Sequence, residues 1–339
     1  MCYNECIVKI AIIILNYKGA DDTIKCLASV AKQTYTNYQI YLIDNGSHDG
    51  SVEKLQPIIK KYKDLIFDIQ PENTGFAGGV NIGIKWALKN NFDYVALLNN
   101  DATIDKNWLK NMLAATVREK VAMVACLMLD GKGEKIIETG DFYTMWGVPE
   151  LRDENKPVRE ASESGSVFGA TGGAVLYSAK LFREIGLFDE KLFAYDEDVD
   201  IAWRANLRGF RGYYEKSAIV YHNAHATSNK MPGFTVTQVF QNLPVVFWKN
   251  VPAGLLWPIG WRFFLAYMMF FGYKIIQGSG WPALKGIVRS WKLWPHAFRE
   301  RRKIQRMKTV STREIKKILW PHLPFKSLNR ARRFFHLAK

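Results

Sequence analysis

The chain has 339 residues, of which 48% are hydrophobic and 23% are charged, the proportions of an ordinary globular protein. These proportions exclude disorder as the default, and the length allows one large domain or two. The net charge of +15 has one source: residues 281–339 hold 17 Lys and Arg against two acidic residues, whereas residues 1–280 hold 30 of each sign. The sequence therefore predicts a neutral body with a basic tail.

The four cysteines, Cys2, Cys6, Cys26 and Cys126, show no metal-type pairing with histidines and no dense disulfide framework. We predict free thiols in a reducing compartment. The first residues lack a basic segment followed by a long apolar run, so we expect no secretory signal.

Strands and helices alternate over the first 128 residues. Apolar, β-branched runs predict strands at 9–15, 38–43, 65–69, 94–98 and 121–128, and helical spacing predicts helices at 21–33, 51–62 and 107–119, with one more ending near residue 90. A continuous apolar run such as 9–15 is typical of a strand buried on both faces. The alternation predicts right-handed βαβ units and a parallel sheet.

The pattern is weaker in the next hundred residues. Residues 129–166 are interpreted as a long loop or a small antiparallel excursion, and 167–177 as a glycine-containing strand where a backbone can approach a ligand. A short helix, 179–185, follows. Edge strands are expected at 210–214 and 218–221.

Two C-terminal segments are rich in aromatic residues. Residues 251–273 are interrupted by Pro258, Gly260 and Arg262, which favours an interfacial or re-entrant segment; a spanning helix and packing on the core remain alternatives. The tail from residue 281 interleaves Trp and Phe with basic residues, which favours an anionic membrane surface. A solvated charged face and single-stranded nucleic acid are the alternatives, but no nucleic-acid recognition motif is present.

The strand at 94–98 ends in Asn99, Asn100 and Asp101. The carboxyl ends of parallel strands form the ligand-binding edge of an open sheet, and a carboxylate with amide neighbours suits a divalent cation. The alternative is a polar turn, with Asp101 or Asp105 capping the next helix. Three further polar loops are expected at the same edge, at 16–19, 44–49 and 73–79.

An ordered set of motifs matches a known family. The set consists of Ile13–Tyr17, Ile43–Ser51, Glu72–Gly79 with Asn81 and Gly83, Leu98–Asp101, Gly186–Glu190, Phe193–Asp200, Arg204 and Tyr221–His222. Over residues 8–252 the chain resembles the family 2 glycosyltransferases, and within them the bacterial rhamnosyltransferase-like branch.

The resemblance implies an α/β GT-A fold, with a Rossmann-like, mostly parallel central sheet flanked by helices. We expect a catalytic domain at 1–230, an acceptor-side or interfacial aromatic helical segment at 231–280, and a basic, amphipathic tail at 281–339 that associates with membrane.

The resemblance also implies a site for the nucleotide sugar. Its expected members are Asn16, Tyr17, Asp44, Asn73, Gly75, Phe76, Gly79, Asn81, Asn99 and Asn100. Asp44 would accept a hydrogen bond from the pyrimidine ring, and Asn16 and Tyr17 would line the base pocket. The glycines would let the backbone come close to the nucleotide, and Asn81 would reach ribose or phosphate. The structural alternatives are a turn residue for Asp44, packing for Tyr17 and a glycine-rich helix start.

By the same resemblance, Mg²⁺ or Mn²⁺ would be held by Asp101 and His222, with His225 as a weaker substitute for the histidine. Asn99-Asn100-Asp101 occupies the family's Asp-x-Asp position but supplies one carboxylate, which weakens an all-protein metal site and leaves room for the donor diphosphate and water.

Acidic residues cluster at the start of a predicted helix. Asp198 is our choice for the catalytic base and Glu197 for orienting acceptor or sugar, and the reverse order stays open. Asp196 is expected to cap the helix, and Asp200 to pair with Arg204 at i and i+4. Separately, Lys249 is a weak candidate for an acceptor phosphate, with an ordinary surface lysine as the alternative.

The resemblance implies an inverting, metal-dependent glycosyltransferase at the cytoplasmic face of the membrane. It would move a sugar, with rhamnose as the favoured one, from a dTDP- or UDP-sugar to a growing glycan or a polyprenyl-diphosphate-linked acceptor of a cell-surface polysaccharide. The alternatives are a sugar-nucleotide nucleotidyltransferase, a catalytically degenerate transferase, and a non-catalytic protein that binds nucleic acid or membrane through the tail.

Overall fold

The computed structural model describes residues 8–222 and 231–322. The strands are β1 (Ile10–Asn16), β2 (Tyr38–Asn45), β3 (Leu65–Gln70), β4 (Tyr94–Asn99), β5 (Ala102–Ile104), β6 (Met123–Asp130), β7 (Ile136–Glu138), β8 (Asp141–Tyr143), β9 (Pro149–Leu151), β10 (Gly165–Val167), β11 (Ala174–Ser178) and β12 (Gly212–His222). The α-helices are α1 (Ala20–Val30), α2 (Ser51–Ile59), α3 (Gly75–Lys89), α4 (Trp108–Glu119), α5 (Ala179–Ile185), α6 (Glu197–Leu207), α7 (Phe234–Asn250), α8 (Ala253–Ile276), α9 (Gly280–Ser290), α10 (Trp294–Met307) and α11 (Thr312–Ile318); the 3₁₀ turns are η1 (Val158–Glu160), η2 (Glu190–Leu192) and η4 (Trp291–Leu293).

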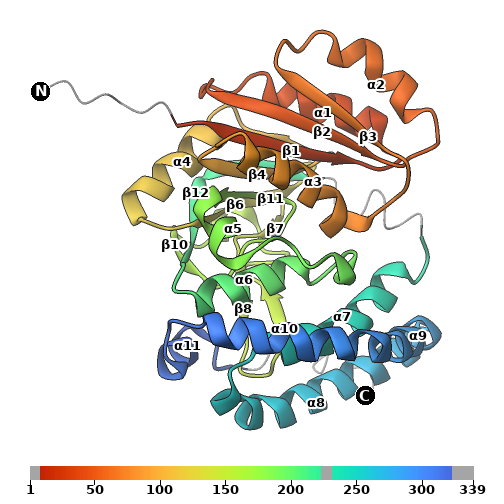
Figure 1. Cartoon of the computed structure of the whole chain (residues 1–339), viewed down its shortest axis with the longest axis vertical. Coiled ribbons are helices and arrows are strands. Elements are labelled where there is room, and N and C mark those ends of the chain that lie inside the picture. The colour runs from red at the N-terminus through yellow and green to blue at the C-terminus, as the bar shows by residue number, and fades with distance from the viewer. Residues whose placement is uncertain (1–7, 223–230, 323–339) are drawn as a thin grey trace, which may run out of the picture.

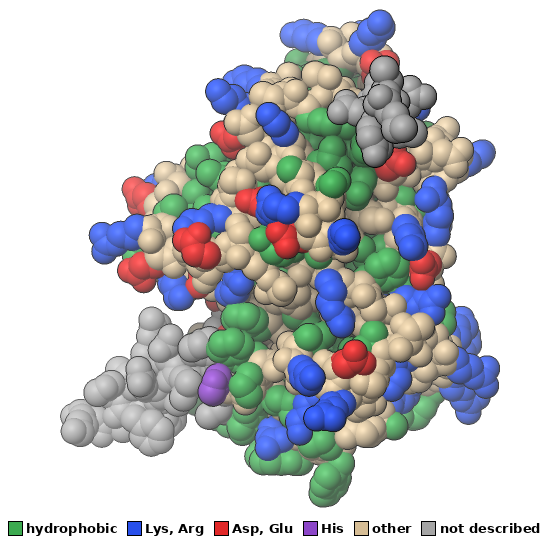
Figure 2. Space-filling model, turned by 90° about the vertical axis from the view of Figure 1, so that its left-hand side faces the viewer, with side chains coloured by type: hydrophobic (Ala, Val, Ile, Leu, Met, Phe, Trp, Pro, Cys, Tyr) green, Lys and Arg blue, Asp and Glu red, His purple; other side chains and the backbone are tan. Residues whose placement is uncertain are grey.

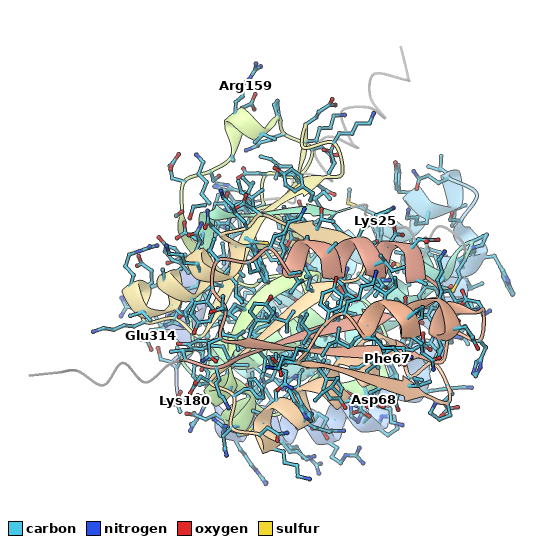
Figure 3. The ribbon with its side chains drawn as sticks, turned by 90° about the horizontal axis from the view of Figure 1, so that it is seen from above. Lys25, Phe67, Asp68, Arg159, Lys180 and Glu314 are labelled. Atoms are coloured by element: carbon cyan, nitrogen blue, oxygen red, sulfur yellow. The ribbon has the colours of Figure 1, made fainter. Side chains whose placement is uncertain are left out.

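One large mixed sheet organises the described chain, with helices on both sides (Figure 1). Its strand order is β10-β12-β6-β11-β4-β1-β2-β3. The four neighbouring strands β4, β1, β2 and β3 run parallel to one another, as the βαβ pattern predicts. From above, Phe67 and Asp68 mark the edge strand β3, with α1 and its Lys25 lying over the sheet (Figure 3). The predicted α/β architecture, a central sheet flanked by helices, is confirmed.

β1 shows why the sheet lies at the centre of the molecule. Its residues alternate between two cores: Ile10, Ile12 and Ile14 belong to the core that includes residues of α1, α2 and α4, whereas Ala11 and Ile13 belong to the core on the side of α3. Side chains of a strand point to opposite faces in turn, so a strand covered on both sides must be apolar throughout. The run at 9–15 meets this requirement.

Three segments differ from the expectation. Residues 129–166 contain the short strands β7 to β10, and the glycine-containing strand predicted at 167–177 begins only at Ala174 as β11. The two predicted edge strands are one strand, β12, which lies inside the sheet between β10 and β6. A β-bulge between Glu215 and Ile219 absorbs the polar Lys216 and Ser217, which read as a break in the sequence.

The C-terminal helices form a layer at one end of the molecule (Figure 1). α8 runs unbroken through Pro258 and Gly260, so the expected interruption near its start is wrong. Among the described residues, α8 is long and apolar enough by length and composition to cross a membrane, and only 22% of its most apolar window is buried.

The described part of the basic tail is folded onto the body. At Gly286 of α9 an added Cβ would lie 2.4 Å from the backbone oxygen of Thr237, so the backbones of α9 and α7 are in close contact. Arg301 of α10 donates a hydrogen bond of 2.8 Å to the backbone oxygen of Val251. Residues 281–322 are therefore integral to the C-terminal layer. The predicted free thiols Cys26 and Cys126 are present and buried, and Cys2 and Cys6 lie outside the described residues.

Candidate active site

A cavity of about 1220 Å³ opens at the edge where β1, β2 and β4 end. It extends from this edge past the β8–β9 hairpin to α7 and α8. Asp101, Asp198 and His222 all line it, so segments separated by more than a hundred residues share one space. Of the expected nucleotide-sugar residues, those in its lining are Tyr17, Asn73, Gly75, Phe76, Asn99 and Asn100.

Asp101 and His222 are in direct contact. The Nε2 atom of His222 lies 2.8 Å from Oδ1 of Asp101 and 3.3 Å from Nδ2 of Asn99. The cause is strand pairing: β12 runs antiparallel to β5, which sets His222 opposite Ala102 and beside Asp101. The Nδ1 atom of His222 is buried and has no hydrogen-bond partner among the described residues. His225 lies outside the described part of the chain.

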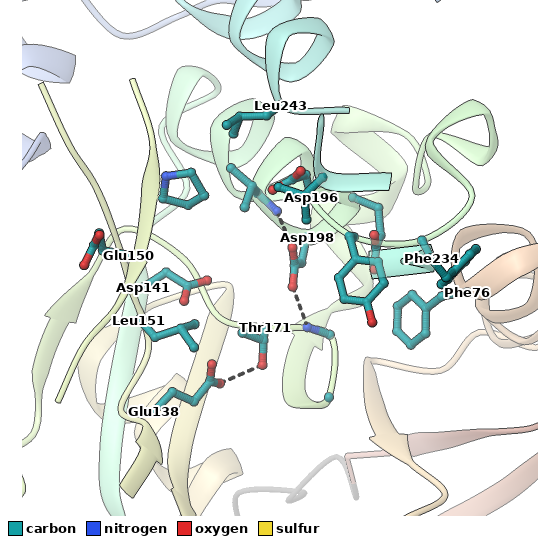
Figure 4. A pocket seen from close by; sticks show the side chains of 18 of the residues that line it. Phe76, Glu138, Asp141, Glu150, Leu151, Thr171, Asp196, Asp198, Phe234 and Leu243 are labelled. Atoms are coloured by element: carbon teal, nitrogen blue, oxygen red, sulfur yellow. Dashed lines mark hydrogen bonds between the residues drawn. The ribbon is translucent and has the colours of Figure 1, made fainter. Parts of the chain in front are cut away.

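Three acidic residues, Asp196, Glu197 and Asp198, meet the cavity at the start of α6 (Figure 4). Asp198 is held by backbone donors: its two carboxylate oxygens accept hydrogen bonds from the amides of Gly172 at 3.1 Å and Val199 at 2.8 Å. Burial nevertheless raises the pKa of Asp198. A carboxylate whose pKa is raised but which is fixed by backbone donors is suited to accept a proton.

Glu197 and Asp196 have unpartnered oxygens in the described structure. Burial, followed by the charge of Asp198, raises the pKa of Glu197 well above its ordinary value, and the same two causes raise the pKa of Asp196 to about 8. Each keeps one buried oxygen without a hydrogen bond. Asp196 occupies the N-cap position of α6, as expected, with φ 64, and its side chain makes no capping hydrogen bond.

Glu138 of β7 is a cavity residue that the sequence did not reveal. It is buried, and its Oε1 accepts a hydrogen bond of 2.7 Å from Oγ1 of Thr171 (Figure 4). Burial and, to a smaller extent, the charge of Asp198 raise the pKa of Glu138 to about 7, against the lowering effect of the hydrogen bond from Thr171. Glu138 lies in the stretch interpreted as a loop, where a single acid carries no periodic signal.

Asp44 and Asn16 lie beneath the cavity edge and do not line it. Asp44 is 1% exposed; its Oδ2 accepts hydrogen bonds from Nδ2 of Asn16 at 2.7 Å and Oγ of Ser47 at 2.6 Å, and its Oδ1 accepts one from the amide of Ser47 at 3.0 Å. This geometry favours the structural alternative for Asp44 over contact with a pyrimidine ring. The neighbouring Asn45 lines the cavity instead. No alternation or motif distinguishes the two residues in the sequence.

The loop before α3 is shaped by close contacts. Asn73 Oδ1 accepts hydrogen bonds from the amide of Gly75 at 2.8 Å and from Nδ2 of Asn45 at 3.1 Å. Gly75 has φ +76, and an added Cβ would lie 2.4 Å from the backbone oxygen of Phe193, so only glycine fits. This loop therefore presents its backbone to the cavity, as the glycine-rich motif predicts.

Three expected site residues, Gly79, Asn81 and Lys249, lie outside the lining of the cavity. Gly79 packs against Leu15, and Asn81 is buried, donating a 2.9 Å hydrogen bond to the backbone oxygen of Phe188. Lys249 is 1% exposed and forms ion pairs with Asp189 and, at 2.9 Å, with Asp200. Its amine cannot meet an acceptor phosphate, and it is not an ordinary surface lysine either.

The described lining of the cavity is strongly acidic. It includes the carboxylates of Asp101, Glu138, Asp141, Glu150, Glu154, Asp196, Glu197 and Asp198, and it includes no Lys or Arg. A diphosphate bound here would find no protein cation among these residues. A divalent ion fits at Asp101 and His222, since carboxylate oxygen and imidazole nitrogen are ligands for Mg²⁺ or Mn²⁺. Among the described residues no group of three His, Cys, Asp or Glu could hold an ion, so diphosphate and water would complete the shell.

The parallel strands, the glycine-rich loop and the acidic cavity define an α/β enzyme-like domain. Residues 11–186 match the family described as glycosyl transferase family 2, and this match spans more than half of the chain. The chain belongs to this family. The rhamnosyltransferase-like branch stays a prediction.

Relatives with known names cover part of the chain. A poly-beta-1,6-N-acetyl-D-glucosamine synthase of Staphylococcus aureus (strain MSSA476) is 26% identical over 215 residues, covering 60% of this chain and 47% of that protein. An uncharacterized glycosyltransferase of Rickettsia typhi is 27% identical over 219 residues, covering 64% of each. The chain thus spans about half the length of the curated synthase it matches.

Two solved structures share the fold. One is GalNAc-T7 with UDP, GalNAc and Mn²⁺, with a TM-score of 0.58 and 18% identity, covering 72% of this chain and 48% of that one. The other is a mannosyltransferase of Pyrobaculum calidifontis with GDP-Man and Mn²⁺, with a TM-score of 0.52 and 13% identity, covering 88% and 83%. Both support the predicted GT-A fold, with its sheet and flanking helices.

Proposed function

We propose that this chain is a metal-dependent, inverting glycosyltransferase that uses a sugar nucleotide. The observation that carries the proposal is the shared cavity: Asp101 and His222 lie at one wall, Asp198 lies in the same lining, and the described lining holds no Lys or Arg. A donor diphosphate would therefore bind through a divalent ion, which supplies Lewis-acid stabilisation of the leaving group.

Asp198 takes the proton of the acceptor hydroxyl in this proposal. The hydroxyl oxygen then bonds to the anomeric carbon while the bond from that carbon to the diphosphate oxygen breaks, so a single displacement inverts the centre. Glu197 and Glu138, whose pKa values are raised, hold protons near neutral pH and donate hydrogen bonds to sugar or acceptor. The backbone at Gly75 lies against the nucleotide.

The donor is expected to be a dTDP- or UDP-sugar, with dTDP-rhamnose tested first. The acceptor is a growing glycan or a lipid-linked one, in the synthesis of a cell-surface polysaccharide. The related synthase supports the polysaccharide class, because its name specifies a polymer of N-acetylglucosamine. Family membership favours group transfer over the nucleotidyltransferase alternative.

The C-terminal layer supports a place at the inner face of the cell membrane. Large apolar side chains are exposed on α8, α9, η4 and α10: Trp257, Trp261, Phe264, Leu265, Met268, Met269, Ile275, Ile276, Trp281, Leu284, Val288, Trp291 and Phe298. Figure 2 shows hydrophobic side chains at this end of the molecule with Lys and Arg beside them. Apolar and aromatic groups rimmed by basic ones are typical of proteins that sit in an anionic interface.

The test is a donor screen. Purified protein is incubated with dTDP-rhamnose, other dTDP-sugars, UDP-sugars and GDP-mannose, with membrane lipid extract as acceptor, and release of nucleoside diphosphate is measured with Mg²⁺, with Mn²⁺ and with EDTA. We expect release that requires a divalent ion, and His222→Ala should raise the metal concentration for half-maximal rate by about 10- to 100-fold. No release from any donor would overturn the proposal.

A further inference from the structure

One end of the cavity is lined mainly by apolar side chains, with Glu150 and Glu154 of the hairpin region beside them. α7 contributes Val239 and Leu243, and α8 contributes Ala266, Phe270 and Ile276 to this end. Trp146, Val148 and Leu151 from the region of the β8–β9 hairpin add to the lining. Hydroxyl groups placed against such side chains would lose their hydrogen bonds to water without replacement, whereas hydrocarbon would not.

This apolar end is continuous with the catalytic end. Leu243 and Asp198 line the same cavity and are seen together in the close-up (Figure 4). The volume of about 1220 Å³ exceeds the usual 300–1,000 Å³ of a site for one small ligand. A sugar nucleotide and a second ligand can therefore be bound together, the second with one end at Asp198 and the other beside α8.

α8 links this end of the cavity to the outside surface. Leu255, Ile259 and Phe263, spaced four residues apart, pack inward, while Trp257 and Phe264 point to solvent. Met269 and Ile276 line the cavity and are also exposed to solvent, by 61% and 68%. They therefore lie at its mouth, on the helix that carries the largest share of the exposed apolar residues.

The charges of the lining further restrict which ligands the cavity can bind. With eight acidic residues and no Lys or Arg in the described lining, the cavity suits neutral groups better than a second anionic linkage. Lys274 lies outside this lining, and its amine is 5.6 Å from the ring centre of Phe270 and 5.9 Å from that of Tyr273, two aromatic residues that belong to it. An anionic linker between sugar and lipid would therefore be matched by this cation and not by the acidic lining.

We propose that the apolar end of the cavity, at α7 and α8, binds the hydrocarbon chain of a lipid-linked acceptor, which enters from the membrane past Met269 and Ile276. The inference rests on the proposed function and selects the lipid-linked acceptor over a free glycan. The bound hydrocarbon chain holds the acceptor so that the acceptor's sugar hydroxyl meets Asp198.

The test uses alkyl glucosides as neutral probes, from methyl to octyl, at concentrations below micelle formation. Calorimetry on the full chain with Mn²⁺ and UDP measures their affinity. Burying a methylene group in an apolar site is favourable enough that we expect affinity to rise about tenfold for every two methylenes.

The structure offers matched variants on α8. Met269→Glu is paired with Phe264→Glu, since the two side chains are 61% and 60% exposed but only Met269 lines the cavity. Ile276→Glu is paired with its neighbour Ile275→Glu, 54% exposed and outside the lining. The cavity-lining member of each pair should lower octyl glucoside affinity at least tenfold and leave methyl glucoside affinity unchanged, and the other member should leave both unchanged. All four positions are exposed, so folding is retained.

The possible outcomes separate the two proposals. An affinity that is independent of chain length, that follows the number of sugar units instead, or that falls equally in both members of a pair overturns the hydrocarbon site. Chain-length dependence with no turnover of any sugar nucleotide overturns the proposed function and leaves the hydrocarbon site in place.

Discussion

Asp198 and Glu197 are adjacent at the start of α6, yet only Asp198 has both oxygens fixed by backbone amides. We predict that Asp198→Asn lowers kcat by about 10²- to 10⁴-fold, the usual contribution of a general base. Donor affinity, measured by calorimetry with Mn²⁺, should change little, because the base acts on the acceptor. Glu197→Gln is the companion variant: if it shows the larger loss in kcat, the roles are reversed.

The raised pKa of Glu138 leads to a prediction about pH. Burial and the charge of Asp198 raise this pKa to about 7. As pH rises through this value, Glu138 loses the proton with which it donates to sugar or acceptor and gains a charge near Asp198, so kcat/KM should fall on the alkaline side. Glu138→Gln cannot ionise and keeps a donor, so it should remove this alkaline limb near pH 7. A limb that persists in Glu138→Gln would show that another group titrates there.

At this scale the sequence was informative where a residue type is tied to a motif. Asn99-Asn100-Asp101, Glu197-Asp198 and His222 came from separate motifs and meet in one cavity. Asp44, Asn81 and Lys249 follow the family pattern equally well, but their side chains are buried and satisfied by neighbours. Whether a polar side chain faces a cavity or its own core depends on contacts between distant elements, which a linear pattern does not contain.

At the scale of elements, an ion network joins α6, α7 and α10. Lys249 of α7 pairs with Asp189 and with Asp200 of α6, and Nε2 of His296 on α10 lies 2.8 Å from Oδ2 of Asp189. Although burial acts to raise it, the hydrogen bond from His296 and the charge of Lys249 hold the pKa of Asp189 well below its ordinary value. Asp200 also pairs with Arg204 at 2.9 Å, as the i, i+4 spacing predicts.

We predict that Lys249→Met lowers the free energy of unfolding by about 3–5 kcal/mol, because two buried carboxylates lose a partner. Lys180→Met is the matched control, since its 3.8 Å pair with Glu184 is solvent-exposed and should cost less than about 1 kcal/mol. Urea unfolding followed by circular dichroism measures both. Equal midpoints for the two variants would mean that the network adds no stability.

Element boundaries were predictable where periodicity is strong. β1, β2 and α4 end within a few residues of their expected positions. The bounds of β12 were not predictable, because a bulge places two polar residues in the middle of an interior strand. α8 was misjudged at Pro258 because a proline near the start of a helix removes few hydrogen bonds. The rest of α8 packs against α7, α9 and α11.

At the scale of the whole molecule, the separation of charge predicts membrane association. Deleting residues 281–339 would remove α9 and α10, which pack on α7, and so disturb the fold. Substituting exposed residues tests membrane association without removing these helices. We predict that Trp257→Glu with Phe264→Glu lowers binding to vesicles of phosphatidylglycerol and phosphatidylethanolamine at least tenfold, measured by co-flotation at low salt.

Val117→Glu on α4 is the control, because Val117 is an exposed apolar residue far from the C-terminal layer in the chain. It should bind vesicles as the unaltered protein does. Recovery of the double variant with vesicles at the control level would contradict a lipid-facing role for α8. Composition alone located the basic region, but it could not show that part of this region is structural.

β11 is the reversed strand between β4 and β6, and its direction has a consequence for how such a domain can diversify. Loops that follow parallel strands reach the cleft as continuations of the core, whereas Thr171 to Gly173 enter it before their strand begins, with the Gly173 oxygen bonded to the amide of Asn99 at 2.8 Å. Insertions or deletions between Thr171 and Gly173 would shift the Gly172 amide that holds Asp198, while the buried Phe168 and Ala170 lie just before this stretch. Substrate preference can thus drift at 171–173, and varying the length of these residues alone is a direct route to altered acceptors.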